Sequence, residues 1–338
     1  MKKILVTGGL GYIGSHTVVE LQNEGYEVVI IDNLSNSSIE VLEGISAITK
    51  KKPIFEKLDL RDKNEVKSFF KTHKNIEGII HFAASKAVGE SVNEPLLYYE
   101  NNLNTLIYIL QECKEYNIQN FIFSSSCTVY GEPDSLPIKE TAAIKVATSP
   151  YGNTKQISEE IIFDLCFVSN LKSIALRYFN PIGAHESAEI GELPMGVPQN
   201  LIPFITQTAI GLREQLSVFG DDYPTPYGSC VRDYIHVVDL AKAHVIALKR
   251  LLENQSSSKF EVFNIGTGRG SSVLEVVNAF EKVTDQKLNY KIVERRPGDV
   301  ISVFADTTKA NKTLGWKAKK TMEDALLSSW KWEQKIRK

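Results

Sequence analysis

The heptapeptide SPYGNTK places Tyr151 four residues before Lys155, and this is the only pair with that spacing in a chain of 13 tyrosines. Ser149 suits the N-cap of a helix, Pro150 suits its first position, and the residues that follow, QISEEIIFDLCFV, repeat at a helical period. Residues i and i+4 share one face of a helix, so the phenol and the ammonium point into the same space. The spacing is weak evidence by itself, and the rest of the chain must supply a reason for it.

A glycine pattern near the N-terminus supplies that reason. The first apolar run leads into TGGLGYIGSHTVVELQNEG, where Gly8, Gly11 and Gly14 precede a helical segment. Such glycines let backbone amides approach a pyrophosphate at a helix N-terminus. The next strand ends at Asp32, eighteen residues after Gly14, where a carboxylate would bind the adenosine ribose and repel a 2′-phosphate. Because no basic residue occurs in DNLSNSS, we expect NAD rather than NADP.

A nicotinamide cofactor would make Tyr151 a candidate general base. Its ordinary pKa near 10 must fall to about 7, a change of about 4 kcal/mol. A cation at about 4–6 Å contributes roughly 3–4 kcal/mol at an effective dielectric of about 20. We therefore expect Lys155 and an oxidised nicotinamide to lower the pKa of Tyr151 together. Ser126, in the run SSSCTVYG at a strand end, would bridge Tyr151 and a substrate hydroxyl.

Short apolar runs alternate with helical segments and predict an α/β fold with a doubly wound, Rossmann-type parallel sheet. Ligands bind such sheets at the carboxyl ends of the strands, which is where the residues above lie. The predicted strands are KKILVTG, YEVVIID, PIFEKLDL, EGIIHFAA, NFIFSSS and KSIALRYF.

Two domains are predicted. Residues 1–179 would bind NAD, with a return segment at about 232–266 that holds the strand FEVFNIGTG and a helix, DLAKAHVIALKRLL, capped by Asp239. Proline and glycine become frequent after about residue 180, as in GELPMGVPQNLIPF. Residues at about 180–231 and 267–338 would form a smaller C-terminal substrate-binding lobe over the strand ends.

Composition excludes several classes of function. The chain has 338 residues, 43% of them hydrophobic, and a net charge of −2, which predicts no affinity for nucleic acid or anionic membranes. No apolar run reaches membrane-spanning length, and ILV near the N-terminus is too short for a signal peptide, so we expect a cytoplasmic protein. The four cysteines and six histidines lack ligand spacing, so neither disulfides nor a metal is expected.

Longer runs carry a resemblance to a known family: VTGGLGYIGSHT, HFAASKAVGES, NFIFSSSCTVYGE, SPYGNTK, RYFNPIGAH and VRDYIHVVDLA. The chain resembles the extended short-chain dehydrogenase/reductase superfamily and, within it, the UDP-glucose 4-epimerases, from residue 2 to the C-terminal WKW. The resemblance implies an isomerase of galactose metabolism that interconverts UDP-galactose and UDP-glucose through a 4-keto sugar and bound NAD. It also implies a homodimer, for which the helices at about 94–116 and 150–168 are the expected interface; the alternative is that these faces are buried within the monomer.

The resemblance also implies roles for individual residues. Tyr151 would be the base, Ser126 would assist it, and Lys155 would also bind the nicotinamide ribose. The implied cofactor contacts are Gly8, Gly11, Tyr12, Ile13, Gly14, Asp32, Asn33, Asp59, Leu60, Phe82, Ala83, Lys86, Asn101, Tyr151, Lys155 and Tyr178. The implied contacts to the UDP-sugar are Lys86, Ser126, Asn180, Asn200, Arg232, Arg296, Asp299 and Val303.

Three positions bear on alternatives. Val303 is small at a position whose bulk limits room for a 2-acetamido group, so UDP-N-acetyl sugars are a hypothesis. Nucleotide-sugar 4,6-dehydratases carry an Asp-Glu pair where this chain has Cys127 and Thr128, which disfavours that reaction. No neighbouring base is apparent that would activate Cys127. A UDP-glucuronate 4-epimerase would share the core motifs, whereas a non-catalytic NAD-binding protein would be expected to lose the tyrosine or the lysine.

Overall fold

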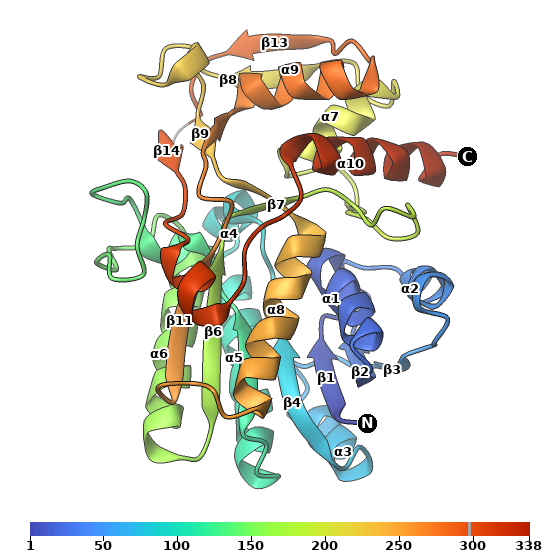
Figure 1. Ribbon diagram of the computed structural model, residues 1–338, viewed down its shortest axis with the longest axis vertical. Coiled ribbons are helices and arrows are strands. Elements are labelled where there is room, and N and C mark those ends of the chain that lie inside the picture. The colour runs from blue at the N-terminus through green and yellow to red at the C-terminus, as the bar shows by residue number, and fades with distance from the viewer. Residues whose placement is uncertain (297–298) are drawn as a thin grey trace.

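The computed structural model describes residues 1–296 and 299–338, and its centre is a seven-stranded parallel sheet in the order β11-β6-β5-β4-β1-β2-β3 (Figure 1). The chain moves outward from β1 to β3 and then returns to the other side of β1 with β4. Such a reversal opens a crevice at the carboxyl ends of the strands, and it confirms the predicted doubly wound fold. The strands are β1 (Lys3–Thr7), β2 (Glu27–Asp32), β3 (Ile54–Lys57), β4 (Ile76–His81), β5 (Asn120–Ser124), β6 (Lys172–Tyr178) and β11 (Phe260–Ile265).

Helices cover both faces of this sheet, as strands with buried residues on both sides require. One face packs against α1 (Tyr12–Asn23), α2 (Val41–Thr49) and α8 (Val237–Leu252). The other face packs against α3 (Lys63–Thr72), α5 (Pro95–Glu115) and α6 (Pro150–Val168), and the short α4 (Val88–Asn93) precedes α5.

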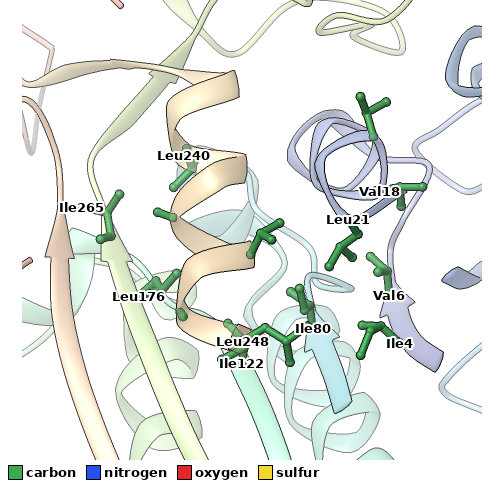
Figure 2. Packing of buried hydrophobic residues seen from close by; sticks show 14 of the residues in the cluster. Ile4, Val6, Val18, Leu21, Ile80, Ile122, Leu176, Leu240, Leu248 and Ile265 are labelled. Atoms are coloured by element: carbon green, nitrogen blue, oxygen red, sulfur yellow. The ribbon is translucent and has the colours of Figure 1, made fainter. Parts of the chain in front are cut away.

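Alternation along the strands divides the apolar residues between these two layers. Ile4 and Val6 of β1 point toward α1 and α8, whereas Leu5 points toward the opposite layer. Figure 2 shows the first layer, in which Val18 and Leu21 of α1 and Leu240 and Leu248 of α8 lie over the strands. Each fully buried aliphatic side chain contributes about 1.5–3 kcal/mol, so both layers hold the strand ends in fixed positions.

The remaining elements form a smaller lobe beyond the carboxyl ends of the strands, at the top of Figure 1. Its core includes Phe280 and Trp330, whose rings meet edge to face at 5.9 Å. The lobe contains β8 (Leu216–Phe219) paired with β13 (Tyr290–Val293), the sheet of β12 (Ser271–Ser272), β9 (Val231–Arg232) and β14 (Ser302–Val303), and helices α7 (Leu201–Ala209), α9 (Val273–Thr284) and α10 (Met322–Ile336). The pair β7 (Asn180–Ile182) and β10 (Tyr234–His236) lies between the lobe and the large sheet.

The expected return segment joins the large sheet, but one detail of the prediction is wrong. Helix α8 begins at Val237, and its N-cap is His236, whose Nδ1 accepts a hydrogen bond from the Val238 amide. Asp239 lies inside the first turn and is buried. Its carboxylate accepts hydrogen bonds from the amides of Lys319 and Lys320, each at 2.7 Å. Asp239 therefore joins α8 to the segment before α10, a long-range contact that a local capping pattern cannot reveal.

The chain also returns to the large sheet near its end. Ala310, Leu314 and Trp316 pack into the same layer as α8, and Trp316 donates a hydrogen bond to the Asp239 carbonyl. The division into two domains stays a prediction. None of the helices within the described residues is both long enough and apolar enough to cross a bilayer.

Candidate active site

The glycine turn between β1 and α1 leaves room for a phosphate group. Gly8 has a φ of 66°, a conformation that favours glycine, and a Cβ there would lie 2.9 Å from the Ala83 amide nitrogen. A Cβ at Gly14 would lie only 2.2 Å from the Gly8 carbonyl oxygen. Gly11 precedes α1 and has no side chain to cap it, so the first amides of the helix stay available to an anion. This cradle fits the pyrophosphate of a dinucleotide.

Asp32 ends β2 beside this turn and is buried. Its Oδ2 accepts a hydrogen bond from the Leu10 amide at 3.1 Å, which ties the glycine turn to the second strand. Its Oδ1 accepts from the Leu34 amide at 3.0 Å and from Ser37 Oγ at 2.8 Å. A carboxylate has about four acceptor sites, so these three bonds leave capacity for a ribose hydroxyl.

The adenosine end of the crevice also contains an arginine that the sequence did not reveal. Because β2 and β3 are neighbours, Asn33 donates a hydrogen bond to Asp59, at 3.3 Å. Arg61 binds the same carboxylate through Nε and Nη2, at 3.0 and 2.7 Å. Hydrogen bonds from Arg61 are the main reason that the pKa of Asp59 falls to about 2. The charge of Arg61 is thus balanced, so this cation does not overturn the expected preference for NAD.

These features line a cleft of about 690 Å³ at the carboxyl ends of the strands. All sixteen residues predicted to contact the cofactor line it, from the glycine turn to Tyr178. Of the residues predicted to contact the UDP-sugar, Lys86 and Asn200 line it as well. The cleft runs from Asp32 and Asp59 at one end to Tyr151 and Lys155 at the other, a path that one dinucleotide would follow.

Helix α6 positions the tyrosine and the lysine as predicted. It begins at Pro150, and Ser149 caps it by accepting a hydrogen bond from the Gly152 amide at 3.1 Å. Tyr151 and Lys155 both line the cleft, with Lys155 Nζ 5.9 Å from the centre of the Tyr151 ring. The ammonium group donates a hydrogen bond to the Ser124 carbonyl at 2.8 Å. The lysine is therefore fixed between the helix and the end of β5.

The polypeptide alone does not lower the pKa of Tyr151, and the downward shift expected with NAD bound stays a prediction. Burial raises the pKa of Tyr151 well above 10, Tyr178 raises it further, and an interaction with Ser126 opposes the rise. Burial also lowers the pKa of Lys155 to about 8, against the attraction of Glu159. Both groups are buried and the ammonium group is directed to the Ser124 carbonyl, so desolvation is the dominant effect on each. The positive charge of an oxidised nicotinamide would favour the phenolate.

Ser126 and Cys127 lie where β5 gives way to a short 3-10 turn, Cys127–Tyr130. Ser126 is buried, caps this turn through the Thr128 amide at 3.2 Å, and lies beside Tyr151. Burial raises the pKa of the Cys127 thiol to about 12, while Arg232 lowers it. The thiol therefore stays protonated near neutral pH, in line with the expectation that no neighbouring base activates it.

The predicted UDP contacts of the smaller lobe gather around one carboxylate. Asp299 Oδ1 accepts a hydrogen bond from Arg296 Nη2 at 2.6 Å and lies 3.8 Å from Arg232 Nη2. Val303 of β14 pairs with Arg232 of β9 in the backbone register. Asn180 stands apart in β7, where its amide donates to the Asp233 carbonyl at 2.9 Å. Arginines 232 and 296 are a suitable pair for a diphosphate.

Sequence reasoning missed Glu192, which connects the lobe to the cofactor cleft. Its Oε1 accepts a hydrogen bond from Asn200 Nδ2 at 2.6 Å and lies 3.5 Å from Lys86 Nζ. Its backbone carbonyl accepts from Trp332 Nε1 in α10 at 2.9 Å. No sequence signal marked it, because two of its partners, Lys86 and Trp332, are far away in the chain.

Asn102 was missed for a different reason, since the run YYENNLN does signal polar residues in a helix. The predicted contact was its neighbour Asn101, which lines the cleft and donates to Ser85 Oγ at 2.9 Å. Asn102 is buried and binds both backbone groups of Ser85, at 2.8 and 3.0 Å, together with Thr154 of α6 at 3.0 Å. It therefore positions the loop that carries Lys86 against helix α6.

A dinucleotide cradle and a Tyr-x-x-x-Lys pair that face one cleft define the class of extended short-chain dehydrogenase/reductase enzymes. A family model described as GDP-mannose 4,6 dehydratase matches residues 5–328. UDP-glucose 4-epimerase of Bacillus subtilis (strain 168) is 52% identical over 331 residues, which is 98% of this chain and 96% of the relative.

Two solved structures give the same result. UDP-glucose-4-epimerase from Stenotrophomonas maltophila, with bound NAD and formylated UDP-arabinopyranose, is 46% identical with a TM-score of 0.95, covering 100% of this chain and 99% of that chain. UDP-glucose 4-epimerase from Bifidobacterium longum, in complex with NAD+ and UDP, is 46% identical with a TM-score of 0.94 and covers 99% of each chain. The chain belongs to the family of that model and, within it, to the UDP-glucose 4-epimerases, which confirms the resemblance.

Proposed function

We propose that the protein interconverts UDP-galactose and UDP-glucose with NAD as a retained cofactor. The observation that carries this proposal is one cleft, lined by the glycine turn and Asp32 at one end and by Tyr151 and Lys155 at the other. The close relatives are UDP-glucose 4-epimerases, and structural neighbours contain NAD together with UDP or a UDP-sugar.

The chain supplies the proton chemistry. Tyr151 takes the proton from the 4-hydroxyl of the sugar, directly or through Ser126, which lies beside it. Lys155 holds a positive charge near the phenolate while it is fixed to the Ser124 carbonyl. NAD, when bound, supplies the acceptor for the hydride at C4 and returns that hydride. Tyr151 then gives the proton back to the epimerised hydroxyl.

Binding of the substrate is concentrated on its diphosphate. Arg232, Arg296 and Asp299 of the lobe, with Asn200 and Lys86 at the cleft, surround the place proposed for UDP. Charge-assisted hydrogen bonds to a diphosphate are strong, so the nucleotide stays held while the keto sugar turns over. Asp299 would share its two arginines with the diphosphate when UDP binds.

A 4,6-dehydratase reaction is disfavoured even though the family model bears that description. Such a reaction must eliminate water across C5 and C6, which requires an acid and a base after Ser126. The positions concerned hold Cys127, whose thiol has a pKa of about 12, and Thr128, whose hydroxyl does not ionise near neutral pH.

Val303 supports a wider choice of substrate. It is half-buried and lies opposite Arg232 in the register of β14 and β9, next to the proposed diphosphate site. A valine leaves more space there than a bulkier side chain, so we infer that UDP-N-acetylglucosamine is also accepted. Substitution Val303→Tyr should abolish turnover of the N-acetylated sugar and leave UDP-galactose as a substrate.

A homodimer through α5 and α6 belongs to the same proposal. These helices pack on each other, yet Leu96 and Phe167 are each 80% exposed and Val168 is 75% exposed. Apolar surface of this kind suits a second copy of the chain. A cytoplasmic location stays a prediction, and the four free cysteines fit a reducing compartment.

Proton NMR of UDP-galactose with purified protein and no added nucleotide tests the function. We expect UDP-glucose to accumulate to a stable mixture, and Tyr151→Phe to slow the reaction by about 10³-fold while the fold and bound NAD remain. Absence of turnover, even with NAD supplied, would refute the UDP-galactose assignment. UDP-glucuronate would then be tested next.

A further inference from the structure

A buried ion pair lies directly behind the proposed catalytic residues. Glu159 of α6 and Arg177 of β6 form a two-pronged pair, with Arg177 Nη2 at 2.5 Å from Oε2 and Nε at 3.0 Å from Oε1. Both side chains are less than a tenth exposed. Replacing a buried ion pair by well-packed apolar residues is often neutral or stabilising, so stability alone does not account for it.

The two members of the pair hold opposite ends of one segment, Ser124–Tyr130. Ser125 Oγ donates a hydrogen bond to Glu159 Oε1 at 2.5 Å. At the other end, the Arg177 guanidinium lies over the Tyr130 ring, 4.8 Å from its centre. Tyr130 is buried, and its hydroxyl donates to Asn264 of β11 at 2.6 Å. Ser126 lies between these two fixed points.

The same glutamate is one helical turn from Lys155. Helix α6 therefore contacts the end of β5 twice in succession, through Lys155 at the Ser124 carbonyl and through Glu159 at the Ser125 hydroxyl. Ser126, which lies beside Tyr151, is the next residue in the chain. A shift of this segment along the helix would separate Ser126 from Tyr151.

We propose that the Glu159–Arg177 ion pair is a positioning device for the reaction, which fixes both ends of Ser124–Tyr130 so that Ser126 and Lys155 face Tyr151. This inference rests on the proposed function. Neither member of the pair touches the cleft, so both act through the residues that they hold.

Glu159 of the pair also stabilises the positive charge of Lys155. The Lys155 ammonium group is faced by the Ser124 carbonyl and the Phe123 ring of β5, by neutral His81 of β4, and by Tyr151 and Glu159 of its own helix. Glu159 favours the ammonium form and opposes burial, which lowers the pKa of Lys155 to about 8. Loss of Glu159 would lower that pKa further, and the ammonium would be lost at a lower pH.

The test is the double variant Glu159→Leu/Arg177→Met in the NAD-loaded protein. It leaves no unpaired buried charge, so the fold should survive. We expect kcat to fall about 10–100-fold with KM for UDP-galactose little changed, because the reacting groups are misplaced while the UDP contacts remain. The alkaline limb of kcat should move to lower pH, since Lys155 must be protonated and activity is lost as the pH rises through its pKa.

The chain offers a matched control pair. Arg250 of α8 and Glu261 of β11 are also largely buried and bonded at 2.7 Å, and their other side-chain hydrogen bonds go to Thr313 and Ser257, neither of which lines the cleft. The double variant Arg250→Met/Glu261→Leu should leave kcat and its pH profile unchanged. If both double variants give the same kcat and the same pH profile, the positioning role is overturned.

A milder variant keeps the proposal testable if the double variant fails to fold. Ser125→Ala removes one hydrogen bond to Glu159 and no charge, and we expect kcat to fall about 3–10-fold. The proposal is overturned if Ser125→Ala leaves kcat unchanged. It is also overturned if small residues without a hydroxyl group at position 125 restore kcat as well as threonine does. Threonine keeps the hydroxyl and should restore activity.

A readout without substrate separates this proposal from the proposed function. The ultraviolet absorbance of the Tyr151 phenolate in NAD-loaded protein is obtained by subtracting the Tyr151→Phe version of each variant. The Glu159→Leu/Arg177→Met change should move phenolate formation to higher pH, because Ser126 and the lysine charge are displaced. An unmoved titration overturns the positioning role, whether or not UDP-galactose is the substrate.

Discussion

Asp32 and Asp299 are carboxylates that face the two proposed ligands, and the chain holds them differently. Asp32 is buried and accepts hydrogen bonds from two backbone amides and from Ser37, all from the turns that follow β1 and β2. Asp299 is held by the side chains of Arg296 and Arg232, and that of Arg296 is 59% exposed. Backbone contacts fix the cofactor site before binding, whereas side-chain contacts in the lobe can be exchanged for those of a ligand.

This difference agrees with the proposal that NAD stays bound through many turnovers, whereas the UDP-sugar is released after each one. A site built from backbone groups needs little reorganisation, so it holds a retained cofactor at low cost. A site built from arginines on short strands can release its product after each turnover. If this comparison is correct, changes to the turn should abolish cofactor binding, and changes to the lobe should alter substrate affinity by smaller factors.

The largest effect is expected from Gly14→Ala. The added Cβ would lie 2.2 Å from the Gly8 carbonyl oxygen and 2.9 Å from the Gly9 Cα, so the backbone of the turn must move. We expect unfolding to become easier by about 1–3 kcal/mol. We also expect affinity for NAD to fall by about 100-fold, because a displaced turn no longer matches the pyrophosphate. Thermal unfolding and the NAD content after gel filtration measure both effects.

Gly89→Ala is the matched control for that change. A Cβ at Gly89 meets no atom within 4 Å, and the residue lies in α4. Alanine there should be neutral or stabilise by up to about 1 kcal/mol. Retention of NAD by Gly14→Ala at the level of this control would show that the turn is not preset for the cofactor.

All residues predicted to contact the cofactor line one cleft, whereas only Lys86 and Asn200 of those predicted to contact the UDP-sugar do, and the difference has a physical reason. Gly14, Asp32 and Tyr151 act through neighbours close in the chain, so strand ends, glycine spacing and helical period predict their positions. Glu192 acts through contacts between separate elements, with Lys86 and with Trp332 of α10, which no local pattern encodes. Arg61 binds Asp59 only two residues away, but the spacing does not show that this pair lies in the cofactor cleft.

The same limit applies to the electrostatics of Tyr151 and Lys155. Spacing predicted correctly that Tyr151 and Lys155 share a face, but it did not show that both would be buried or that Ser124 would take the ammonium group. Burial raises the pKa of Tyr151 in the polypeptide alone, an effect that the spacing did not reveal. Desolvation depends on what the whole fold removes from water, and the sequence of one helix does not contain that information.

Arg296→Ala probes the lobe, where an intermediate effect is expected. The guanidinium is more than half exposed and binds Asp299, so its removal should leave thermal stability nearly unchanged. We expect KM for UDP-galactose to rise about 10-fold, because one charge-assisted contact to the diphosphate is lost, and kcat to change little. Steady-state kinetics by NMR or a coupled assay measure both constants.

Arg295→Ala is its control, one residue away. Arg295 binds Asp222 at 2.7 Å and lies over the Tyr223 ring, 4.1 Å from its centre, rather than at Asp299. Its loss should raise KM less than the loss of Arg296. Equal effects of the two variants would mean that the lobe contributes general positive charge instead of a defined pair of contacts.

The smallest effect is expected from Glu192→Gln. The direction of the change in KM tests whether the lobe, unlike the cofactor turn, has exchangeable contacts. Glutamine can keep the hydrogen bond from Asn200 but removes the negative charge 3.5 Å from Lys86, a pair whose lysine side chain is half exposed. Such pairs contribute about 0–1 kcal/mol, so KM should change by no more than about 5-fold.

If the lobe contacts are exchangeable, KM for UDP-galactose falls, because Lys86 is released toward the ligand and one repulsive carboxylate is gone. The fall should disappear at high salt, which screens these charges. A rise in KM would instead show that Glu192 holds Lys86 in a preset position. The cofactor site and the substrate site would then both be preset before their ligands bind.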